Sequence, residues 1–553
     1  MNRLHIDRKT ISKDITAGLT AAVAAIPDGM ATASLAGVSP IYGLYNLMVG
    51  TPIASIFTSS VYMAVINASA MALAAHDALA QYTGEEQVEA MVTLTLLVGL
   101  FMLLLGVLKL GWLTRFISNS VMRGFLTGIA IVIILGQLSD FTGYEIQGAN
   151  YLADVIDLLG NLDQINLATL GIGALTIVMI LVLDRTPLKS FSMLIALIIG
   201  AAFVKLMSLE SVALVGEIPG GLPAPMLPNL TLVPELLLSA IAIGIIGLVQ
   251  ATGVSQGYPN PDGDFPNPDG DFKGQGLGNI VAGFFQGLPI GGSVSGTALV
   301  VGAGAQSRWS NIFTGLFVTV GVLLFATQIE NLPMTSLAAI LILAGFQAIK
   351  PIEIRKVWNT TSLSAAVFLF TLIATLFLPV QQAIFLGVII QIFLFIFQSA
   401  ERMTIIELIP TGDGDFEEHP APAVLQSSSV TMLLPYGSLF FAAARDFEEE
   451  APSPEDATYS AVIVILRGRE QIGSTAIGVF ERYAAALKEN GGRLFLAEVS
   501  ESVRLQLDKT GAIETIGAEN VLAVGERMMA SLQSAYDTAE AWLTETGSPD
   551  RGG

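Results

Sequence analysis

The chain has 553 residues, of which 52% are hydrophobic and only 13% charged, and its mean hydropathy is +0.66. A soluble protein of this length carries roughly a quarter charged residues, so the composition indicates a membrane protein. The absence of cysteine excludes a disulfide framework, a thiolate zinc site and a cysteine nucleophile. The net charge of −21, with no stretch that clusters Lys and Arg, excludes a nucleic-acid-binding face.

Apolar runs fill the chain up to about Ser399, separated by short connections. With their flanks, the clearest runs are long enough to cross ~30 Å of hydrocarbon; they are 91–108, 129–138, 170–183, 194–206 and 363–378. Counting all such runs predicts fourteen spans. The fold class expected is therefore an α-helical polytopic membrane protein.

The positions of the basic residues predict the orientation of these spans. The long polar loops 76–90, 141–167 and 209–232 contain no Lys or Arg, and they fall on the side opposite to the basic residues, with Lys205 as the one exception. The positive-inside rule then predicts that both termini lie in the cytoplasm. The membrane expected is a bacterial-type inner membrane. The basic residues on the cytoplasmic side are Arg3, Arg8, Lys9, Lys13, Lys109, Arg115, Arg123, Arg185, Lys189, Lys273, Arg308, Lys350, Arg355 and Lys356.

A weak internal symmetry relates the two halves of this region. The first span carries a polar break at "IPDGMATAS", and the third begins with "SSVYMAVINASAMALA". Seven spans later, the eighth carries "GLVQATGVSQG" and the tenth begins with "GGSVSGTA". An odd offset inverts the second set, and interrupted helices in inverted repeats indicate a secondary transporter with a midplane site. Small residues that merely allow close helix packing are the alternative explanation.

The stretch "GGSVSGTALVVGAGAQS", residues 291–307, suggests what such a site binds. Helices that begin at the bilayer centre present free N–H groups, and each N-terminus carries about half a positive charge. Two such N-termini facing each other favour an anion. Ser295 and Thr297 are candidate hydroxyl donors, and Gly296 lets a ligand approach the backbone.

The chain resembles the sulfate permease (SulP) family of anion transporters over nearly its whole length. The resemblance rests on "IPDGMATASLAGVSPIYGLY", on "GQGLGNIVAGFFQGLPIGGSVSGTALVVGAGAQS" and on the C-terminal region. It implies fourteen spans in two inverted repeats of seven, which form a core and a gate domain. It also implies a transmembrane domain over 1–400 and a cytoplasmic α/β STAS domain over 401–553.

The same resemblance implies an anion held between the N-termini of spans three and ten. Three positions depart from the family pattern: Asp28 stands where Gln is common, Gln250 where Glu is common, and Gly296 where Arg is common. Loss of the Arg removes a fixed positive charge, so the substrate is expected to bring a cation or to be accompanied by one. The substrate-binding residues so implied are Asp28, Thr32, Asn67, Ala68, Gln250, Ser295, Gly296 and Thr297.

Asp28 is the candidate for coupling transport to a cation. It lies about fifteen residues beyond Lys13, or ~22 Å along a helix, deep in the bilayer. An intramembrane carboxylate is costly unless it is paired or protonated, so Asp28 is predicted to carry a proton alongside the anion. Sodium coupling stays open, and a neutral Asp hydrogen-bonded within the helix bundle is the structural alternative.

Two further segments attract attention. "PNPDGDFPNPDGDF" at 259–272 is a perfect seven-residue duplication, which we interpret as a lengthened cytoplasmic loop rather than a calcium site.

In the C-terminal tail, apolar strands such as "SAVIVILRG" alternate with helices, as a STAS domain requires. Gly473-Ser474 replaces the Asp-Ser pair of related regulators, and "DFEEEAPSPED" at 446–456 is predicted to be an acidic loop.

The prediction is a secondary active transporter of small anions (dicarboxylate, bicarbonate or sulfate), coupled to protons. The alternatives are a nucleobase permease of the same architecture and a membrane sensor that signals through its tail. An enzyme is not expected, because the three His residues form no nucleophile–base pair or metal-ligand cluster. No cofactor, metal or nucleic acid is expected; the expected partners are the lipid bilayer and the substrate, and a homodimer stays open.

Overall fold

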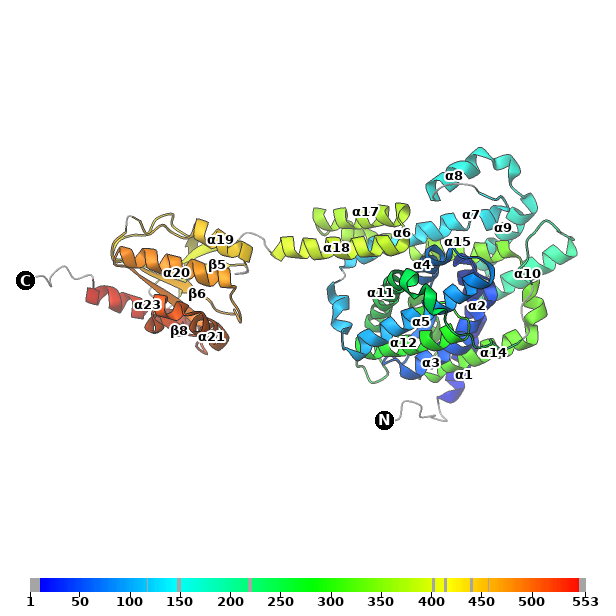
Figure 1. Ribbon diagram of the computed structural model, residues 1–553, viewed down its shortest axis with the longest axis horizontal. Coiled ribbons are helices and arrows are strands. Elements are labelled where there is room, and N and C mark those ends of the chain that lie inside the picture. The colour runs from blue at the N-terminus through cyan, green and yellow to red at the C-terminus, as the bar shows by residue number, and fades with distance from the viewer. Residues whose placement is uncertain are drawn as a thin grey trace, which may run out of the picture. The chain divides into compact units, whose positions relative to one another are not determined.

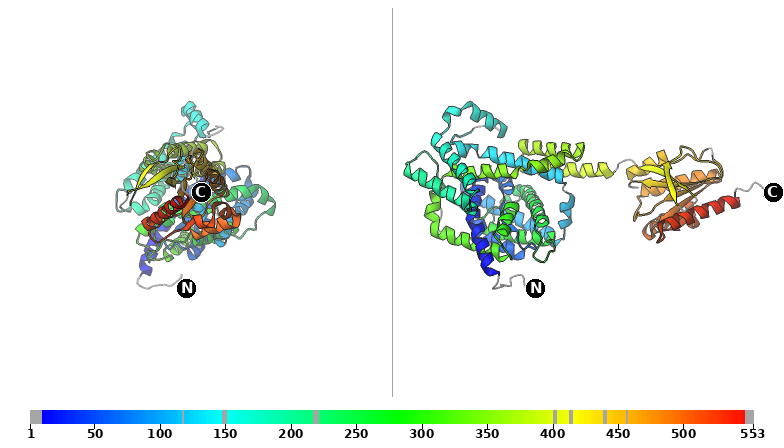
Figure 2. Two further views of the ribbon diagram at one scale, coloured as in Figure 1. Left: turned by 90° about the vertical axis from the view of Figure 1, so that its left-hand side faces the viewer. Right: turned by 180° about the vertical axis from the view of Figure 1, so that it is seen from behind.

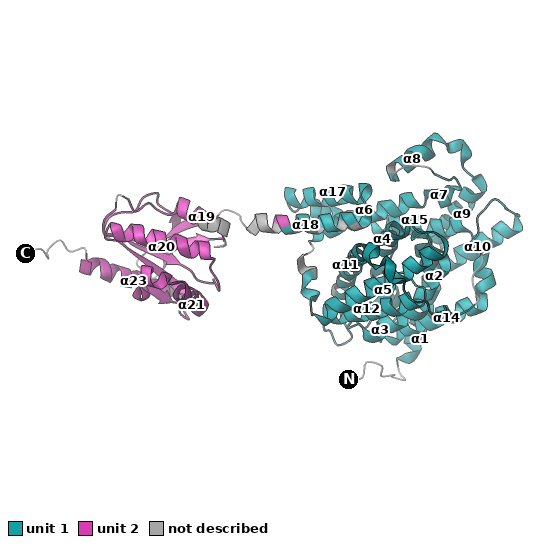
Figure 3. Ribbon diagram, viewed as in Figure 1, with its two compact units in different colours: residues 1–392 teal, residues 393–553 magenta. Residues whose placement is uncertain are grey.

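The computed structural model describes residues 10–116, 118–146, 151–216, 221–399, 403–411, 415–437, 441–455 and 457–546. The chain forms two compact units, Met1–Ile392 and Phe393–Gly553 (Figures 1 and 3). Of the basic residues expected in the cytoplasm, Arg3, Arg8 and Lys9 lie outside the described residues.

The first unit is helical and apolar. Within the described residues, six helical stretches are long and apolar enough to cross a membrane: Ile11–Leu35, Gly84–Val107, Asn119–Thr142, Leu230–Ser255, Trp309–Glu330 and Met334–Trp358. Shorter apolar helices include Leu167–Leu183 (α9), Ser192–Leu206 (α10) and Ser362–Phe377 (α17). The membrane class predicted from composition is confirmed, whereas the count of fourteen spans stays a prediction.

These helices pack in two sets. The first helix set contains α1 (Ile11–Leu35), α5 (Gly84–Val107), α11 (Val233–Gly257), α12 (Pro268–Phe284) and α14 (Trp309–Glu330). The second helix set contains α6 (Asn119–Gly136), α9, α10, α15 (Met334–Ala348) and α17. Figure 1 shows α6 beside α17 and, apart from them, α5 beside α12. Other helices of this part of the chain include α2 (Pro40–Tyr45), α3 (Thr51–Phe57), α7 (Leu138–Thr142), α8 (Tyr151–Gly160), α16 (Pro351–Trp358), α18 (Val380–Ser399) and a π-helical turn at Asn46–Gly50.

Two short β-strands lie among the helices of the first helix set. β1 (Ala64–Asn67) leads into α4 (Ser69–Leu79), and β2 (Ile290–Ser293) leads into α13 (Val294–Gly302). The strands pair antiparallel, with Ile66 opposite Gly291. The structure thus has the interruptions that the sequence predicts at the start of the third and tenth spans.

The other two predicted interruptions are wrong, because α1 and α11 are continuous helices. In α1, the Thr32 hydroxyl donates to the carbonyl oxygens of Asp28 and Gly29, both at 2.9 Å. In α11, the Thr252 hydroxyl donates to the Leu248 carbonyl at 2.9 Å. Such bonds satisfy a polar side chain within its own helix, so "IPDGMATAS" and "GLVQATGVSQG" do not break it.

The duplicated segment also differs from its predicted form. Only the first copy, 259–265, is a loop, while the second copy, 266–272, provides the start of α12. The Asn267 side chain accepts a hydrogen bond from the Asp269 amide at 2.9 Å, and Pro268 is the first helical residue. Asn as N-cap followed by Pro is a strong helix start, which the interpretation as a lengthened loop overlooked.

The second unit is an α/β domain, as predicted. Its six strands follow the order β4-β3-β5-β6-β7-β8, and β5 to β8 run parallel. α23 packs on one face of the sheet and α20 on the other, so that each face has its own hydrophobic core (Figure 2). The elements are β3 (Thr404–Pro410), β4 (Phe416–Pro420), β5 (Val430–Tyr436), α19 (Phe441–Glu450), β6 (Ala461–Ile465), α20 (Ser474–Glu489), β7 (Arg493–Val499), α21 (Glu501–Thr510), α22 (Ala512–Ile516), β8 (Val521–Ala523) and α23 (Met528–Thr546).

The acidic segment 446–456 is not a loop throughout, because its first five residues belong to α19. Phe447 is 1% exposed, and its ring packs edge-on against Phe480 at 5.3 Å. Glu448 forms an ion pair with Arg482 of α20 at 2.7 Å. The buried Phe447 side chain therefore fixes α19 in place. From the sequence a loop is predicted here, because the segment is highly charged.

Candidate functional site

The β1–β2 pair brings together the N-termini of two short helices. Because the strands are antiparallel, α4 starts beside the first residue of β2, and α13 starts beside the first residue of β1. Asn67 is opposite Ile290, and Ala64 is opposite Ser293. The positive ends of two helix dipoles thus adjoin one small sheet.

The N-terminus of α4 lacks a side-chain cap. Its N-cap residue is Ala68, and the first helical bond runs from the Ala72 amide to the Ala68 carbonyl at 2.9 Å. The amides of the first turn, at Ser69, Ala70 and Met71, therefore have no acceptor within their own helix. An anion is the ligand that such a turn favours.

The N-terminus of α13 is capped by a residue that the sequence interpretation missed. The Ser293 hydroxyl accepts from the Gly296 amide at 3.1 Å, and it lies 3.2 Å from the Ser295 hydroxyl. Ser295 is exposed, whereas Thr297 is fully buried. The Thr297 hydroxyl donates to the Ser293 carbonyl at 2.6 Å and accepts from the Ala64 amide at 3.0 Å. Its proton is therefore not available to a ligand here, and the predicted donor role of Thr297 is replaced by a bridge between β1 and α13.

Packing alone requires glycine at position 296, whether or not Gly296 also contacts a ligand. A Cβ atom at this position would lie 2.8 Å from Ile66 Cδ1 and 3.2 Å from Ala64 Cβ. The missing side chain thus lets α13 start directly against β1. On this side of the helix, a side chain at position 296 would clash with β1.

Asn67 holds α1 and α2 together at the end of β1. Its Nδ2 donates to the carbonyl oxygens of Gly29 and Gly43, both at 3.1 Å, and its Oδ1 accepts from Asn46 Nδ2 at 3.0 Å. A Cβ on Gly43 would come within 1.9 Å of the Gly29 carbonyl oxygen, so only glycine permits this crossing. The side chain of Asn67 is thereby occupied by the protein.

Polar side chains of α12 support β2 in the same way. Asn279 bonds both backbone groups of Ile290: its Nδ2 donates to the carbonyl at 2.8 Å, and its Oδ1 accepts from the amide at 2.8 Å. The Gly292 amide donates to Gln275 Oε1 at 3.0 Å. Buried backbone polar groups need such partners in a membrane. Gln275 and Asn279 are one helical turn apart inside an otherwise apolar stretch, which is the signal that could have found them.

Asp28 and Gln250 flank this arrangement on the two long helices. Asp28 is half-buried in α1 and directly precedes Gly29, whose carbonyl bonds Asn67. Gln250 is half-buried in α11, and among the described residues its Oε1 is buried without a hydrogen-bond partner. Ala251, the residue after Gln250, packs against β2, since a Cβ on Gly292 would lie 3.0 Å from Ala251 Cα.

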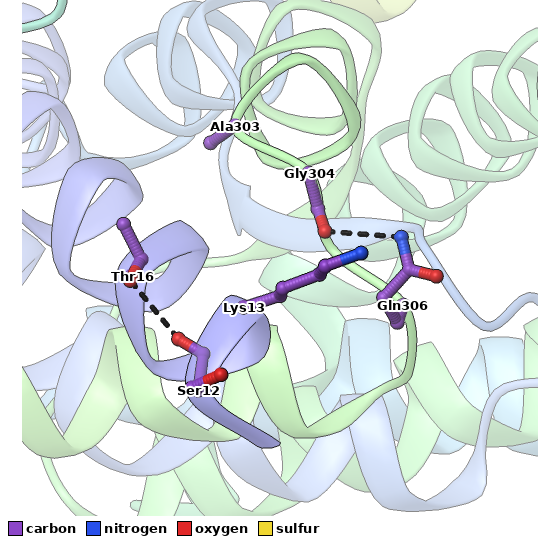
Figure 4. Close-up of a pocket in the computed structure, with 6 residues that line it drawn as sticks. All are labelled: Ser12, Lys13, Thr16, Ala303, Gly304 and Gln306. Atoms are coloured by element: carbon purple, nitrogen blue, oxygen red, sulfur yellow. Dashed lines mark hydrogen bonds between the residues drawn. The ribbon is translucent and has the colours of Figure 1, made fainter. Parts of the chain in front are cut away.

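A hollow of about 390 Å³ lies at the other end of α13, lined by Ser12, Lys13, Thr16, Ala303, Gly304 and Gln306. Figure 4 shows the Lys13 side chain extending from α1 toward Gly304 and Gln306. Because the hollow adjoins the last residues of α13, it is separate from the helix starts described above. Within the residues that the structure describes, no three His, Cys, Asp or Glu side chains form a group that could hold a metal ion.

These features define an integral, multi-pass membrane protein with paired half-helices and a C-terminal α/β domain. The chain belongs to the sulfate permease family, whose pattern matches residues 11–371, and residues 421–534 match the STAS domain. The predicted family and its domain order are thereby confirmed.

Several known proteins are similar to this chain. A probable sulfate transporter, 4.2, of Arabidopsis thaliana is 26% identical over 92% of this chain and 79% of its own length. A probable sulfate transporter of Mycobacterium tuberculosis is 27% identical over 93% of this chain and 94% of its own length. Among solved structures, the murine anion transporter Slc26a9 superposes with a TM-score of 0.86 at 19% identity, covering 97% of this chain and 92% of that one. The transmembrane domain of the cyanobacterial bicarbonate transporter BicA gives 0.59 at 22% identity, covering 70% of this chain and 98% of that one.

Proposed function

We propose that this protein, an anion transporter of the sulfate permease family, is a secondary active symporter that carries a small oxyanion together with a proton. The substrate classes are dicarboxylate, bicarbonate and sulfate, the last two in keeping with the names of its relatives. We further propose an inner-membrane location with both termini in the cytoplasm, because the long loops of the other side lack basic residues.

One observation carries this proposal: the uncapped first turn of α4 adjoins the strand pair that also starts α13. The N–H groups of Ser69 to Met71, with the Ser295 hydroxyl of α13, offer donors to an oxyanion. The segments 64–71 and 290–297, which form the two strands and helix starts, contain no Arg or Lys, and position 296 is glycine. The helix dipoles are then the main source of positive potential.

Asp28 is the proposed proton carrier. A carboxyl group on a membrane helix is most stable when neutral, and a nearby bound anion disfavours its charged form further. Arrival of the substrate therefore promotes protonation, and the neutralised pair crosses together. Thr32, Ala68, Gln250, Gly296 and Thr297 form the surrounding shell in this proposal.

Purified protein in proteoliposomes provides the test. We expect uptake of at least one of radiolabelled succinate, bicarbonate or sulfate, and we expect an inward proton gradient to accelerate it. A sodium gradient in place of the proton gradient identifies the alternative coupling ion. Binding of an anion without any uptake would overturn the transporter and favour a sensor that acts through the STAS domain.

A further inference from the structure

The two identical copies of the duplicated segment adopt different structures. In the first copy, the Gly263 amide donates to the Asn260 carbonyl at 2.9 Å, and Gly263 has a φ of +88°. Phe265 at the end of this copy is 69% exposed, whereas Phe272 at the end of the second is 1% exposed. The residue after each copy explains the difference: Pro266 disfavours helical backbone at Phe265, while Phe272 is succeeded by residues that continue α12.

Both copies bind the same loop, residues 59–61, which leads into β1. From the first copy, Asn260 Oδ1 accepts from the Val61 amide at 2.8 Å, and Asn260 Nδ2 donates to the Ser59 carbonyl at 3.3 Å. From the second copy, Asp271 Oδ1 accepts from the Ser60 amide at 2.8 Å and from the Ser59 hydroxyl at 3.0 Å. The duplication therefore supplies two different side chains to one loop.

Asp271 also connects this loop to the helix that carries Gln250. Its second oxygen, Oδ2, accepts from the Ser255 hydroxyl of α11 at 2.6 Å, and the residue is 1% exposed. Three donors from two other segments thus converge on one buried carboxyl group of α12. None of these contacts serves the proposed binding of the anion directly.

The packing around Asp271 leaves little freedom. A Cβ on Gly270 would lie 2.7 Å from Ser59 Cβ, and a Cβ on Gly274 would lie 2.3 Å from the Thr58 backbone nitrogen. Ser60 precedes Ala64, the first residue of β1, by only four residues. A displacement of the loop is therefore transmitted to β1 and to the start of α4.

We propose that Asp271 is a positioning residue for the anion site: it fixes the loop before β1 against α11 and α12, and thereby sets where the amides of α4 lie relative to Gln250. Asn260 of the first copy holds the same loop through the Val61 amide and the Ser59 carbonyl. The inference rests on the proposed function, because it takes the site that Asp271 positions to be the site of transport.

The duplication supplies a matched control for the test. Asp264 occupies in the first copy the position that Asp271 occupies in the second, and it is exposed. We expect Asp271→Ala to raise the KM for the best of succinate, bicarbonate and sulfate by roughly tenfold, because it removes several buried hydrogen bonds. Asp264→Ala should leave the KM within about twofold.

A conservative variant separates positioning from charge. In Asp271→Asn, Oδ1 can still accept from the Ser60 amide, and Nδ2 can donate to the Ser255 hydroxyl oxygen. We therefore expect Asp271→Asn to recover most of the wild-type KM. If Asp271→Ala lowers only the yield of folded protein while the KM per folded molecule is unchanged, the positioning role is overturned.

Hydrogen exchange tests the inference without transport. Amides of residues 64–71 should exchange about tenfold faster in Asp271→Ala than in the wild type, and at the wild-type rate in Asp264→Ala. Equal exchange in both variants would refute the inference even if the wild type takes up an anion. Suppose that the wild type takes up none of the three anions while the amides of residues 64–71 still exchange faster in Asp271→Ala than in the wild type. That result would count against the proposed function alone.

Discussion

The carboxylate of Asp77 accepts a hydrogen bond at 2.8 Å from the backbone amide of Val380. Asp77 lies near the end of α4, and Val380 is the first residue of α18. α4 packs with α11 and α1 of the first helix set, whereas α18 packs on the second, since a Cβ on Gly387 would lie 2.9 Å from Val121 Cγ1 in α6. One helix therefore starts at the candidate anion site and ends at a polar contact with the other set.

This contact leads to a prediction about movement between the helix sets. If transport requires the sets to move relative to each other, the bond between Asp77 and Val380 must break in each cycle. Because the chain has no native cysteine, the double variant Asp77→Cys/Val380→Cys offers a single disulfide. We expect an oxidant to stop uptake by this variant and a reductant to restore it.

Each single cysteine variant serves as the control, and its uptake should not respond to the oxidant. A double variant that is fully cross-linked by mass spectrometry and still transports at the wild-type rate would show that the sets do not separate at this contact.

Gly296 and Gly302 allow a comparison within one helix. A Cβ on Gly296 meets Ile66 and Ala64, whereas no atom of the described residues lies within 4 Å of a Cβ on Gly302. Gly296→Leu should abolish uptake and destabilise the protein by about 1–3 kcal/mol through overpacking. Gly302→Leu should keep both uptake and thermal stability. Normal uptake by Gly296→Leu would mean that the start of α13 does not form the site.

Asp28→Asn tests the proposed proton coupling. The change is nearly isosteric and removes the proton that the carboxyl group would release and regain, so anion binding should persist. Uptake by the variant should no longer be accelerated by an inward proton gradient, and accumulation against an anion gradient should cease. Comparison of wild type and variant at symmetric pH and with an acidic exterior provides the measurement. The same acceleration in both proteins would exclude Asp28 as the carrier.

The duplicated segment yields a stability prediction from one residue pair. Phe272→Ala should destabilise the protein by about 3–5 kcal/mol, because it empties a buried position. Phe265→Ala, the same change in the same sequence context, should stay within about 0.5 kcal/mol, because Phe265 is 69% exposed. Thermal unfolding in detergent compares the two. Equal losses of stability would contradict the assignment of α12 to the second copy.

Anion binding should not require the C-terminal tail. The hydrophobic cores of the second unit consist of residues from 403 onward, and the candidate site draws on nothing beyond α13. Removal of residues from Thr404 onward should therefore leave a membrane domain that binds the anion, with a lower transport rate. A truncated protein that is monodisperse yet binds none of the anions of the full chain would refute this independence.

The sequence alone determined the class, the family and the location of the key stretch. Apolar run lengths identify membrane helices because hydrocarbon thickness fixes the length that a helix needs. The glycine- and serine-rich start at 291–297 identified a helix beginning because it weakens a membrane helix. The motif around Asp28 and the C-terminal alternation of strands and helices identified the family and the STAS domain.

Only the tertiary structure decided which polar groups are free and which are occupied. Thr297 and Asn67 are candidate binding residues in the sequence, yet chain folding occupies both side chains. The Thr297 hydroxyl accepts from the distant Ala64 amide, and Asn67 donates to the carbonyl oxygens of Gly29 and Gly43. Of the two identical heptads, only the second buries an Asp and its Phe side chain against other segments. A local pattern records the chemistry that a residue can perform, but the choice among its partners depends on contacts between segments far apart in the chain, which periodicity does not encode.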